Sequence, residues 1–201
     1  MVRTFLRYLH LKGFTSVALA DCVPSIRRLA GLPTFLPQQK VQLVLDACDR
    51  TMAMGLRDYA VLMALAKQGL RASEVAALSL DDIDWQSGSV LVHAKGRRQA
   101  MMPLSHHVGA AVVAFIRHGR PASACRHLFL RMLAPHVGFA SGCAITMVAK
   151  EALERAGIHG YAHHGAHLFR HSLATDLLRS GASFAECDRR SDPYPAGHDR
   201  I

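Results

Sequence analysis

Paired cysteines are missing from the sequence. The five cysteines, Cys22, Cys48, Cys125, Cys143 and Cys187, are odd in number, are scattered along the chain and contain no C-x-x-C pair. This distribution suggests neither a disulfide framework nor a zinc ribbon. We therefore expect free thiols in the reducing environment of the cytoplasm.

Long hydrophobic runs are also missing. No apolar stretch reaches the roughly 18 residues that a membrane-spanning helix requires, and the opening stretch MVRTFLRYLHLKG is too polar for a secretory signal. Hydrophobic residues make up 50% and charged residues 19% of the chain, which indicates a globular protein and not a disordered one. Its 201 residues suffice for one domain and a short appendage. We expect a cytoplasmic protein without a membrane partner.

Negative charge is scarce relative to positive charge. Lysine and arginine number 24 against 15 aspartates and glutamates, which gives a net charge of +9. Such a surplus favours a polyanionic partner, nucleic acid above all, because each neutralised phosphate releases condensed counterions. On charge alone, a basic protein without such a partner is an equal alternative.

Apolar residues recur at helical spacing in most of the chain. The stretches are residues 1–13, 37–50, 56–69, 73–80, 106–118, 141–157 and 165–181, with Ser73 as an expected N-cap. The expected buried faces carry Tyr59, Leu62, Met63 and Ala66 in one helix and Leu168, Leu173, Leu177 and Leu178 in the last. Residues 82–104 instead combine β-prone residues with Ser-Gly and Lys-Gly turns. The sequence therefore predicts a mainly α-helical fold with a small antiparallel β-sheet.

Three stretches place basic residues where the local structure can aim them. Arg71 lies between two predicted helices, Lys95 lies at the turn between two strands, and His167 and Arg170 share a helix face. Each residue alone fits a solvated surface charge more readily than a site. Together, two guanidiniums, an ammonium and an imidazole without a carboxylate cluster suit a phosphodiester whose charge grows in the transition state. Such a site needs neither a metal nor another cofactor.

The order of these motifs resembles that of the tyrosine recombinases, the phage-integrase family that includes the Xer-type enzymes. The motifs are G-L-R-x-S-E at residues 69–74, K-G at residues 95–96 and H-x-x-R-H-S-x-A-T at residues 167–175. The resemblance covers roughly residues 37–185. It implies a mainly α tyrosine recombinase catalytic-domain fold, and a function in site-specific DNA recombination or integration.

The resemblance also implies roles for individual residues. Arg71 and Arg170 are expected to grip the non-bridging oxygens of the scissile phosphate, Lys95 to protonate the 5′-hydroxyl leaving group, and His167 to assist proton transfer. Glu74 is expected to brace the active-site helices. In the family a tyrosine then forms a 3′-phosphotyrosyl bond, which conserves the bond energy for strand exchange.

The partner implied is double-stranded DNA, on which family members assemble as tetramers. Arg97 and Arg98 beside the hairpin lysine are expected to contact phosphates, with a solvated turn as an equal alternative.

The resemblance divides the chain into three parts. Residues 14–37 carry Pro24, Gly31, Pro33 and Pro37, a composition typical of a connector. Residues 1–30 resemble the C-terminal remnant of the family's core-binding (SAM-like) domain with its linker, and residues 31–185 resemble the catalytic domain. Residues 186–201 have two prolines, alternating charges and no helical or strand period. We expect them to form an aberrant tail without regular structure, which leaves the catalytic domain incomplete at its C-terminus.

The family's nucleophilic tyrosine has no counterpart that we assign. Tyr194 follows Arg170 by only 24 residues and stands between Pro193 and Pro195, where no helix can present it. His198 follows P-A-G and does not match the family's last histidine either. We therefore expect a monomeric chain that is defective in cleavage, and a non-catalytic DNA-binding remnant is the main alternative.

A histidine-rich zinc site is the third hypothesis. His163, His167 and His171 recur every four residues, and His159 and His164 lie near them in sequence. No cysteine or carboxylate joins the group, and the family resemblance assigns His167 to the reaction. We therefore expect no metal.

Overall fold

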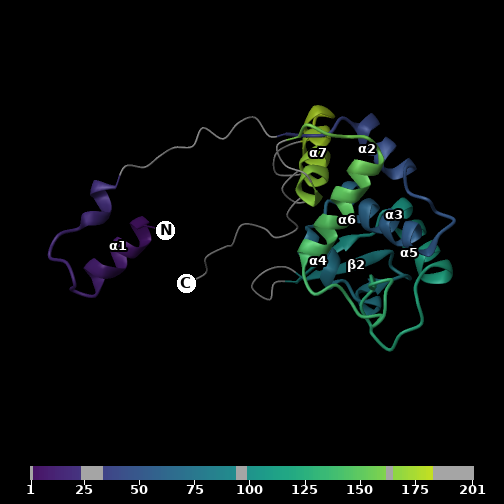
Figure 1. The fold of residues 1–201 in the computed structure, drawn as a ribbon, viewed down its shortest axis with the longest axis horizontal. Helices are drawn as coiled ribbons and strands as arrows, with labels where there is room; N and C mark the ends of the chain where they lie inside the picture. The colour runs from purple at the N-terminus through teal and green to yellow at the C-terminus, as the bar shows by residue number, and fades with distance from the viewer. Residues whose placement is uncertain (1, 24–33, 94–98, 162–164, 183–201) are drawn as a thin grey trace. The chain divides into compact units, whose positions relative to one another are not determined.

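The computed structural model describes residues 2–23, 34–93, 99–161 and 165–182. The chain divides into two compact units, Met1–Pro33 and Thr34–Ile201, and the sequence had placed this boundary between residues 30 and 31. The assignment of the first part to a core-binding domain stays a prediction. Figure 1 draws the course of both units.

The first unit consists of α1 (Val2–Leu11) and the short 3-10 helix η1 (Leu19–Cys22). Gly13, with a φ of 75°, turns the chain after α1, as its place after the apolar stretch predicted. Arg3 ties the two helices together, because its guanidinium donates hydrogen bonds to the carbonyl oxygens of Ala20 (3.0 Å) and Val23 (2.9 Å).

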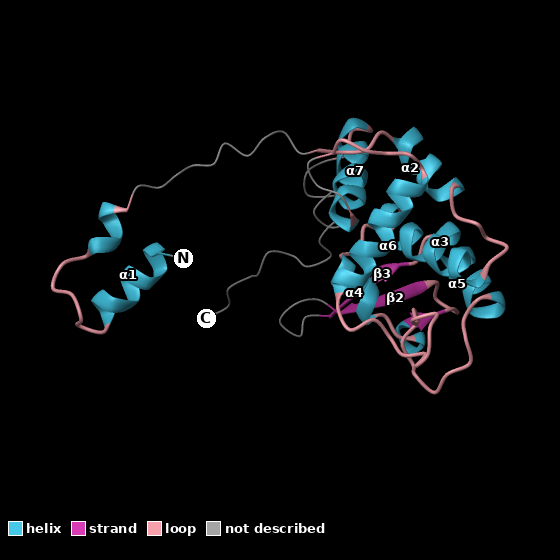
Figure 2. Ribbon diagram, viewed as in Figure 1, coloured by secondary structure: helices cyan, strands magenta, loops and turns pink. Residues whose placement is uncertain are grey.

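The second unit contains the remaining helices and one sheet. Its helices are α2 (Gln38–Asp46), α3 (Ala53–Ala66), α4 (Ala72–Ala77), η2 (Leu80–Asp82), α5 (His106–His118), α6 (Gly142–Arg155) and α7 (Ala166–Arg179). The strands β1 (Ile83–Asp84), β2 (Ser89–His93) and β3 (Gln99–Pro103) form an antiparallel sheet in the order β1-β2-β3 (Figure 2). The predicted fold class, mainly α with a small antiparallel sheet, is confirmed.

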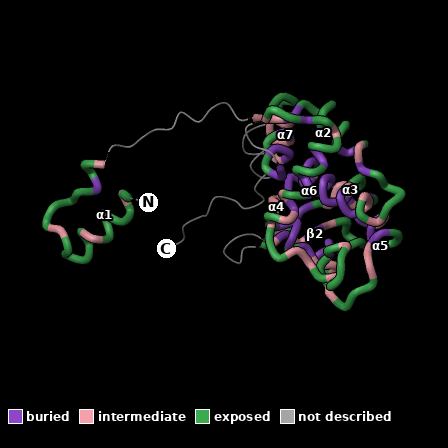
Figure 3. The backbone as a smooth tube through the Cα atoms, in the orientation of Figure 1, coloured by how far each residue is buried: buried purple, intermediate pink, exposed green. Residues whose placement is uncertain are grey.

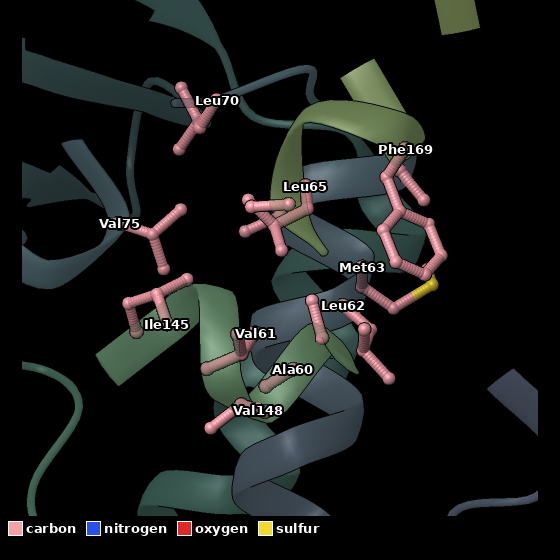
Figure 4. Close-up of a cluster of buried hydrophobic side chains, with 14 of the residues drawn as sticks. Ala60, Val61, Leu62, Met63, Leu65, Leu70, Val75, Ile145, Val148 and Phe169 are labelled. Carbon is pink, nitrogen blue, oxygen red and sulfur yellow. The ribbon is translucent and has the colours of Figure 1, made fainter. Parts of the chain in front are cut away.

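Helix α3 is the centre of the core. Every residue from 60 to 66 is at most 5% exposed, so the prediction of one buried face is wrong for this part of the helix. Helices α5, α6 and α7 all pack against α3, which leaves no side of residues 60–66 to the solvent. Figure 3 shows this buried centre, and Figure 4 shows apolar side chains of α3, α6 and α7 meeting in one cluster.

The buried face of α7 differs from the predicted one. Leu168 is buried, but Leu173 and Leu177 are only partly buried and Leu178 is 37% exposed. The core positions are Ala166, Leu168, Phe169 and Ser172. Ser172 can be buried because its hydroxyl accepts a hydrogen bond from the backbone N–H of Leu36 and donates one to the carbonyl of Leu168, both at 2.7 Å.

Helix α4 begins earlier than predicted. Its N-cap is Arg71 and not Ser73, because the Glu74 carboxylate accepts the backbone N–H of Arg71 at 2.8 Å. A glutamate at the third helical position thus supplies the hydrogen bond that fixes the start of this helix.

Within the described ranges, no helix combines the length and the hydropathy needed to cross a bilayer.

Candidate functional site

Three of the predicted site residues line one pocket. Arg71, His167 and Arg170 surround a pocket of about 310 Å³, together with residues at the start of α6. Arg71 precedes α4, whereas His167 and Arg170 lie on the first turns of α7. Segments about 100 residues apart in the sequence therefore contribute to the same pocket.

Helices begin at this pocket. The pocket is lined by Ala72 and Ser73 of α4, Gly142 and Cys143 of α6, and Ala166 of α7. The first N–H groups of a helix have no partner within the helix, and the helix dipole adds positive potential there. The starts of the 14-residue helices α6 and α7 therefore favour an anion in this pocket.

Two glycines allow the helix starts to approach one another. A Cβ atom on Gly142 would lie 2.7 Å from the backbone nitrogen of Ser73, so only glycine permits this contact between α6 and α4. Gly165, with a φ of 119°, precedes α7, and a Cβ atom there would lie 2.6 Å from Cγ2 of Thr146. A larger residue at either position would force the backbone or packed side chains to shift.

Arg71 is held by a buried carboxylate. Its Nη1 donates a hydrogen bond to Oε1 of Glu74 at 2.9 Å, and the Glu74 side chain is only 2% exposed. The same carboxylate accepts the backbone N–H of Arg71 through Oε2. The Arg71 side chain itself keeps 37% exposure, so Glu74 fixes the guanidinium without enclosing it. This geometry agrees with the bracing role expected for Glu74, which stays a prediction.

Arg170 is tied to the segment that leads into Arg71. Its Nη1 donates a hydrogen bond to the carbonyl oxygen of Gly69, which lies two residues before Arg71. Gly69 has a φ of 71°, a conformation that favours glycine. His167 is exposed beside this pair, and its ring stacks on that of His171 with centroids 5.8 Å apart. The site thus has two guanidiniums held by hydrogen bonds and an exposed imidazole beside them.

Several predicted site residues lie outside the described residues. These are Lys95, Arg97 and Arg98 of the hairpin, His163 and His164 of the zinc hypothesis, and Tyr194 and His198 near the end. Among the residues that the structure does describe, no group of three or more histidines, cysteines or carboxylates could hold a metal ion. The zinc hypothesis therefore gains no support from the described residues.

Sequence reasoning missed the contribution of α6 to the pocket. Cys143 and Thr146 line it beside the basic residues. The local signal was present, because Ser141 caps α6 by accepting the backbone N–H of Cys143 at 3.3 Å. That signal locates the start of a helix and does not say that the start lies next to Arg71.

Comparison with known proteins shows the family. The model of the phage integrase family matches residues 34–190. The chain therefore belongs to the phage integrase, or tyrosine recombinase, family, and the resemblance seen in its motifs is confirmed.

Individual relatives agree with this assignment. The chain is 39% identical over 187 residues to the putative integrase/recombinase y4rA of Sinorhizobium fredii, an alignment that covers 92% of this chain and 45% of the relative. It is 33% identical over 187 residues to the tyrosine recombinase XerD of Mycobacterium tuberculosis, covering 90% of this chain and 60% of the relative. The chain thus spans about half the length of these relatives.

Solved structures show the same fold at low sequence identity. XerH recombinase bound to a palindromic difH substrate aligns with a TM-score of 0.69 at 18% identity, over 86% of this chain and 50% of XerH. XerA recombinase aligns with a TM-score of 0.67 at 19% identity, over 94% of this chain and 72% of XerA. The second unit therefore has the tyrosine recombinase catalytic-domain fold.

Proposed function

We propose that this chain binds double-stranded DNA and grips the scissile phosphate of a recombination site in the pocket between α4, α6 and α7. The observation that carries the proposal is the convergence of Arg71, His167 and Arg170 on one pocket at which two 14-residue helices begin. A phosphodiester gains negative charge when it is attacked, and preorganised donors stabilise that charge. Arg71 and Arg170 would bind the non-bridging oxygens, and His167 would assist proton transfer.

The hairpin between β2 and β3 completes the proposed machinery. Lys95 would protonate the 5′-hydroxyl leaving group, and Arg97 and Arg98 would contact flanking phosphates. Relatives support DNA as the partner, since XerH was solved on its difH substrate and a lambda integrase dimer was solved on a core site. We propose the same class of partner here, with assembly on DNA into the family's tetramers as a further step.

We propose that residues 1–201 bind DNA without cleaving it by themselves. None of the described tyrosines, Tyr8, Tyr59 and Tyr161, lines the pocket. Tyr194 lies between two prolines, which makes it unsuited to a position on a helix. The phosphate-binding half of the reaction is thus assigned to named residues, whereas the nucleophile is assigned to none.

DNA binding at different salt concentrations tests the proposal. The affinity for a short fluorescent duplex is measured by anisotropy for the wild type, Arg71→Ala, Arg170→Ala and the control Arg155→Ala. Arg155 is matched to Arg71, since its side chain is 39% exposed against 37% and also pairs with a buried carboxylate. It lies at the opposite end of α6 from the pocket.

Each pocket variant should weaken binding and lower the slope of log K against log salt by about 1. Arg155→Ala should leave the slope unchanged. Equal slopes for all four proteins would overturn the proposal.

A further inference from the structure

A chain of hydrogen bonds lies at the end of β2 and β3 where residues 94–98 connect the two strands. Strand β2 ends at His93, strand β3 begins at Gln99, and these two residues are paired across the strands. The sequence between them is A-K-G-R-R, which contains Lys95, Arg97 and Arg98. His93 and Gln99 are therefore the points at which the basic segment leaves and rejoins the sheet.

The hydrogen-bond chain starts at a buried carboxylate. Asp82 ends η2 and is 9% exposed, and its Oδ2 accepts the backbone N–H of Ser79 at 2.8 Å. Its Oδ1 lies 2.8 Å from Nε2 of His93. The 3-10 helix thus fixes Asp82 on the segment before β1, and Asp82 in turn holds the last residue of β2.

The carboxylate determines the tautomer of His93. An ionised carboxylate only accepts hydrogen bonds, so Nε2 of His93 must carry the proton that it donates to Asp82. In the neutral ring, Nδ1 is then an acceptor, and the side-chain Nε2 of Gln99 lies 3.2 Å from it as the donor. The chain therefore runs from η2 through His93 to the first residue of β3.

We propose that Asp82 and His93 are positioning residues that hold both ends of the basic hairpin segment so that Lys95 can reach the DNA phosphate. This inference rests on the proposed function, in which Lys95 contacts the phosphate. Restricting a lysine side chain to conformations near its target before binding reduces the conformational entropy that is lost on binding. Asp82 and His93 do not touch the substrate in this scheme and act only through the segment that they hold.

A double-mutant cycle distinguishes this role from a merely structural one. The affinity for a short fluorescent duplex is measured with and without Lys95→Ala, in the wild type and in His93→Phe, which keeps a ring and removes both hydrogen bonds. In the wild type, Lys95→Ala should weaken binding roughly tenfold, as expected for a charged hydrogen bond to phosphate. In His93→Phe it should weaken binding by less than about threefold, because the contact is already impaired.

Two further variants control for folding. His93→Gln retains an amide N–H that can donate to Asp82, so it should restore most of the effect of Lys95→Ala. Asp84→Asn disturbs the other end of the sheet, where the Asp84 carboxylate accepts hydrogen bonds from Gln86 N (2.9 Å) and Ser87 Oγ (2.7 Å). It should leave the effect of Lys95→Ala at its wild-type value even if it lowers the melting temperature.

A spectroscopic measurement tests the tautomer directly. In protein labelled with ¹⁵N-histidine, the His93 signals, assigned by their loss in His93→Phe, should show a protonated Nε2 and an unprotonated Nδ1 at neutral pH. Asp82→Asn should shift this balance. A mixed tautomer population in the wild type would contradict the proposed chain.

The outcomes separate the inference from the proposed function. If Arg71→Ala and Arg170→Ala leave DNA binding unchanged, the proposed function itself fails. If these variants weaken binding but the effects of Lys95→Ala and His93→Phe simply add, the positioning role is wrong and the pocket stands. If Lys95→Ala has no effect in any background, the positioning role is likewise overturned.

Discussion

Two clusters in the second unit each combine two arginines with one buried carboxylate. In the first cluster, Arg57 donates from Nε and Nη2 to Oδ1 of Asp58 at 3.0 and 2.7 Å, and Arg155 Nη2 donates to Oδ2 at 3.3 Å. Asp58 is 1% and Arg57 8% exposed. Both arginines are thus used to compensate a carboxylate within the core.

The pocket cluster uses its arginines differently. Glu74 binds Arg71, whereas Arg170 donates to the backbone carbonyl of Gly69. Both guanidiniums line a pocket at which helices begin, where the positive potential of the backbone adds to theirs. The comparison shows that the number of charged groups does not distinguish a structural ion pair from the proposed phosphate site. The position of the charged groups relative to helix starts and to solvent distinguishes the two.

The largest expected effect concerns the buried cluster. Asp58→Ala leaves Arg57 buried without its carboxylate and should lower the free energy of unfolding by about 3–5 kcal/mol. Urea denaturation followed by circular dichroism measures this change. Replacing Arg57 and Asp58 together by Met and Leu should recover much of the loss, because no unpaired charge is then buried. Equal stability of Asp58→Ala and the wild type would contradict the structural role.

The second prediction concerns the contact that forms the pocket. Gly142→Ala places a Cβ atom 2.7 Å from the Ser73 backbone and should cost about 1–3 kcal/mol of stability while it weakens DNA binding. Gly109→Ala on α5 is the matched control, since the nearest atom would be Leu104 Cδ2 at 3.5 Å. That control should stabilise the protein by up to about 1 kcal/mol. Thermal unfolding and anisotropy of the two variants check both statements, and a Gly142→Ala protein that binds DNA normally would argue against the pocket.

The exposed ion pair of Arg126 and Asp81 should contribute only slightly to the stability of the protein. The hydrogen bonds from Arg126 hold the pKa of Asp81 below its ordinary value of 3.8. Because the folded-state pKa is depressed, the stabilisation is complete above pH 3.8 and is lost as the pH falls through the lower folded-state value. The urea midpoints of wild type and Asp81→Asn should therefore differ slightly at neutral pH and converge in acid. A difference that grows in acid would contradict the lowered pKa of Asp81 in the folded state.

The last prediction is that no covalent protein–DNA adduct forms. Residues 1–201, incubated with a nicked suicide substrate, should form no covalent protein–DNA adduct, and Tyr194→Phe should behave like the wild type. Denaturing gel electrophoresis detects an adduct as a shifted band. An adduct that the Tyr194→Phe change abolishes would identify Tyr194 as the nucleophile and would refute the view that this pocket binds phosphate without cleaving it.

Much of the local structure followed from the sequence. Helical spacing predicted the stretches that became α2, α3, α5, α6 and α7, and the Ser-Gly turn before β2 was predicted from its residues. Gly88 at that turn has a φ of 63°, which glycine adopts without strain. These features depend on neighbouring residues alone, so a short window of sequence contains the information that determines them.

The family motifs also came from the sequence, because their order along the chain is a sequence property. The comparisons confirmed the family from residues 34–190. The sequence could not supply the orientation of α7, since Ser172 is buried through a hydrogen bond to Leu36, 136 residues away. The start of α4 was predicted at the wrong residue although its signal is local, since Glu74 at the third helical position, and not Ser73, fixes it.

The sequence by itself thus determined most of the secondary structure and the family, and it named the candidate site residues. Only the tertiary structure decided that Arg71, Cys143 and Arg170 border one pocket, and that Asp82 holds His93 at the end of the hairpin. The physical reason is that periodicity and capping are local, whereas the pocket depends on close approach between segments distant in sequence. Gly142 permits that approach, because it brings the start of α6 against α4 where no larger residue fits.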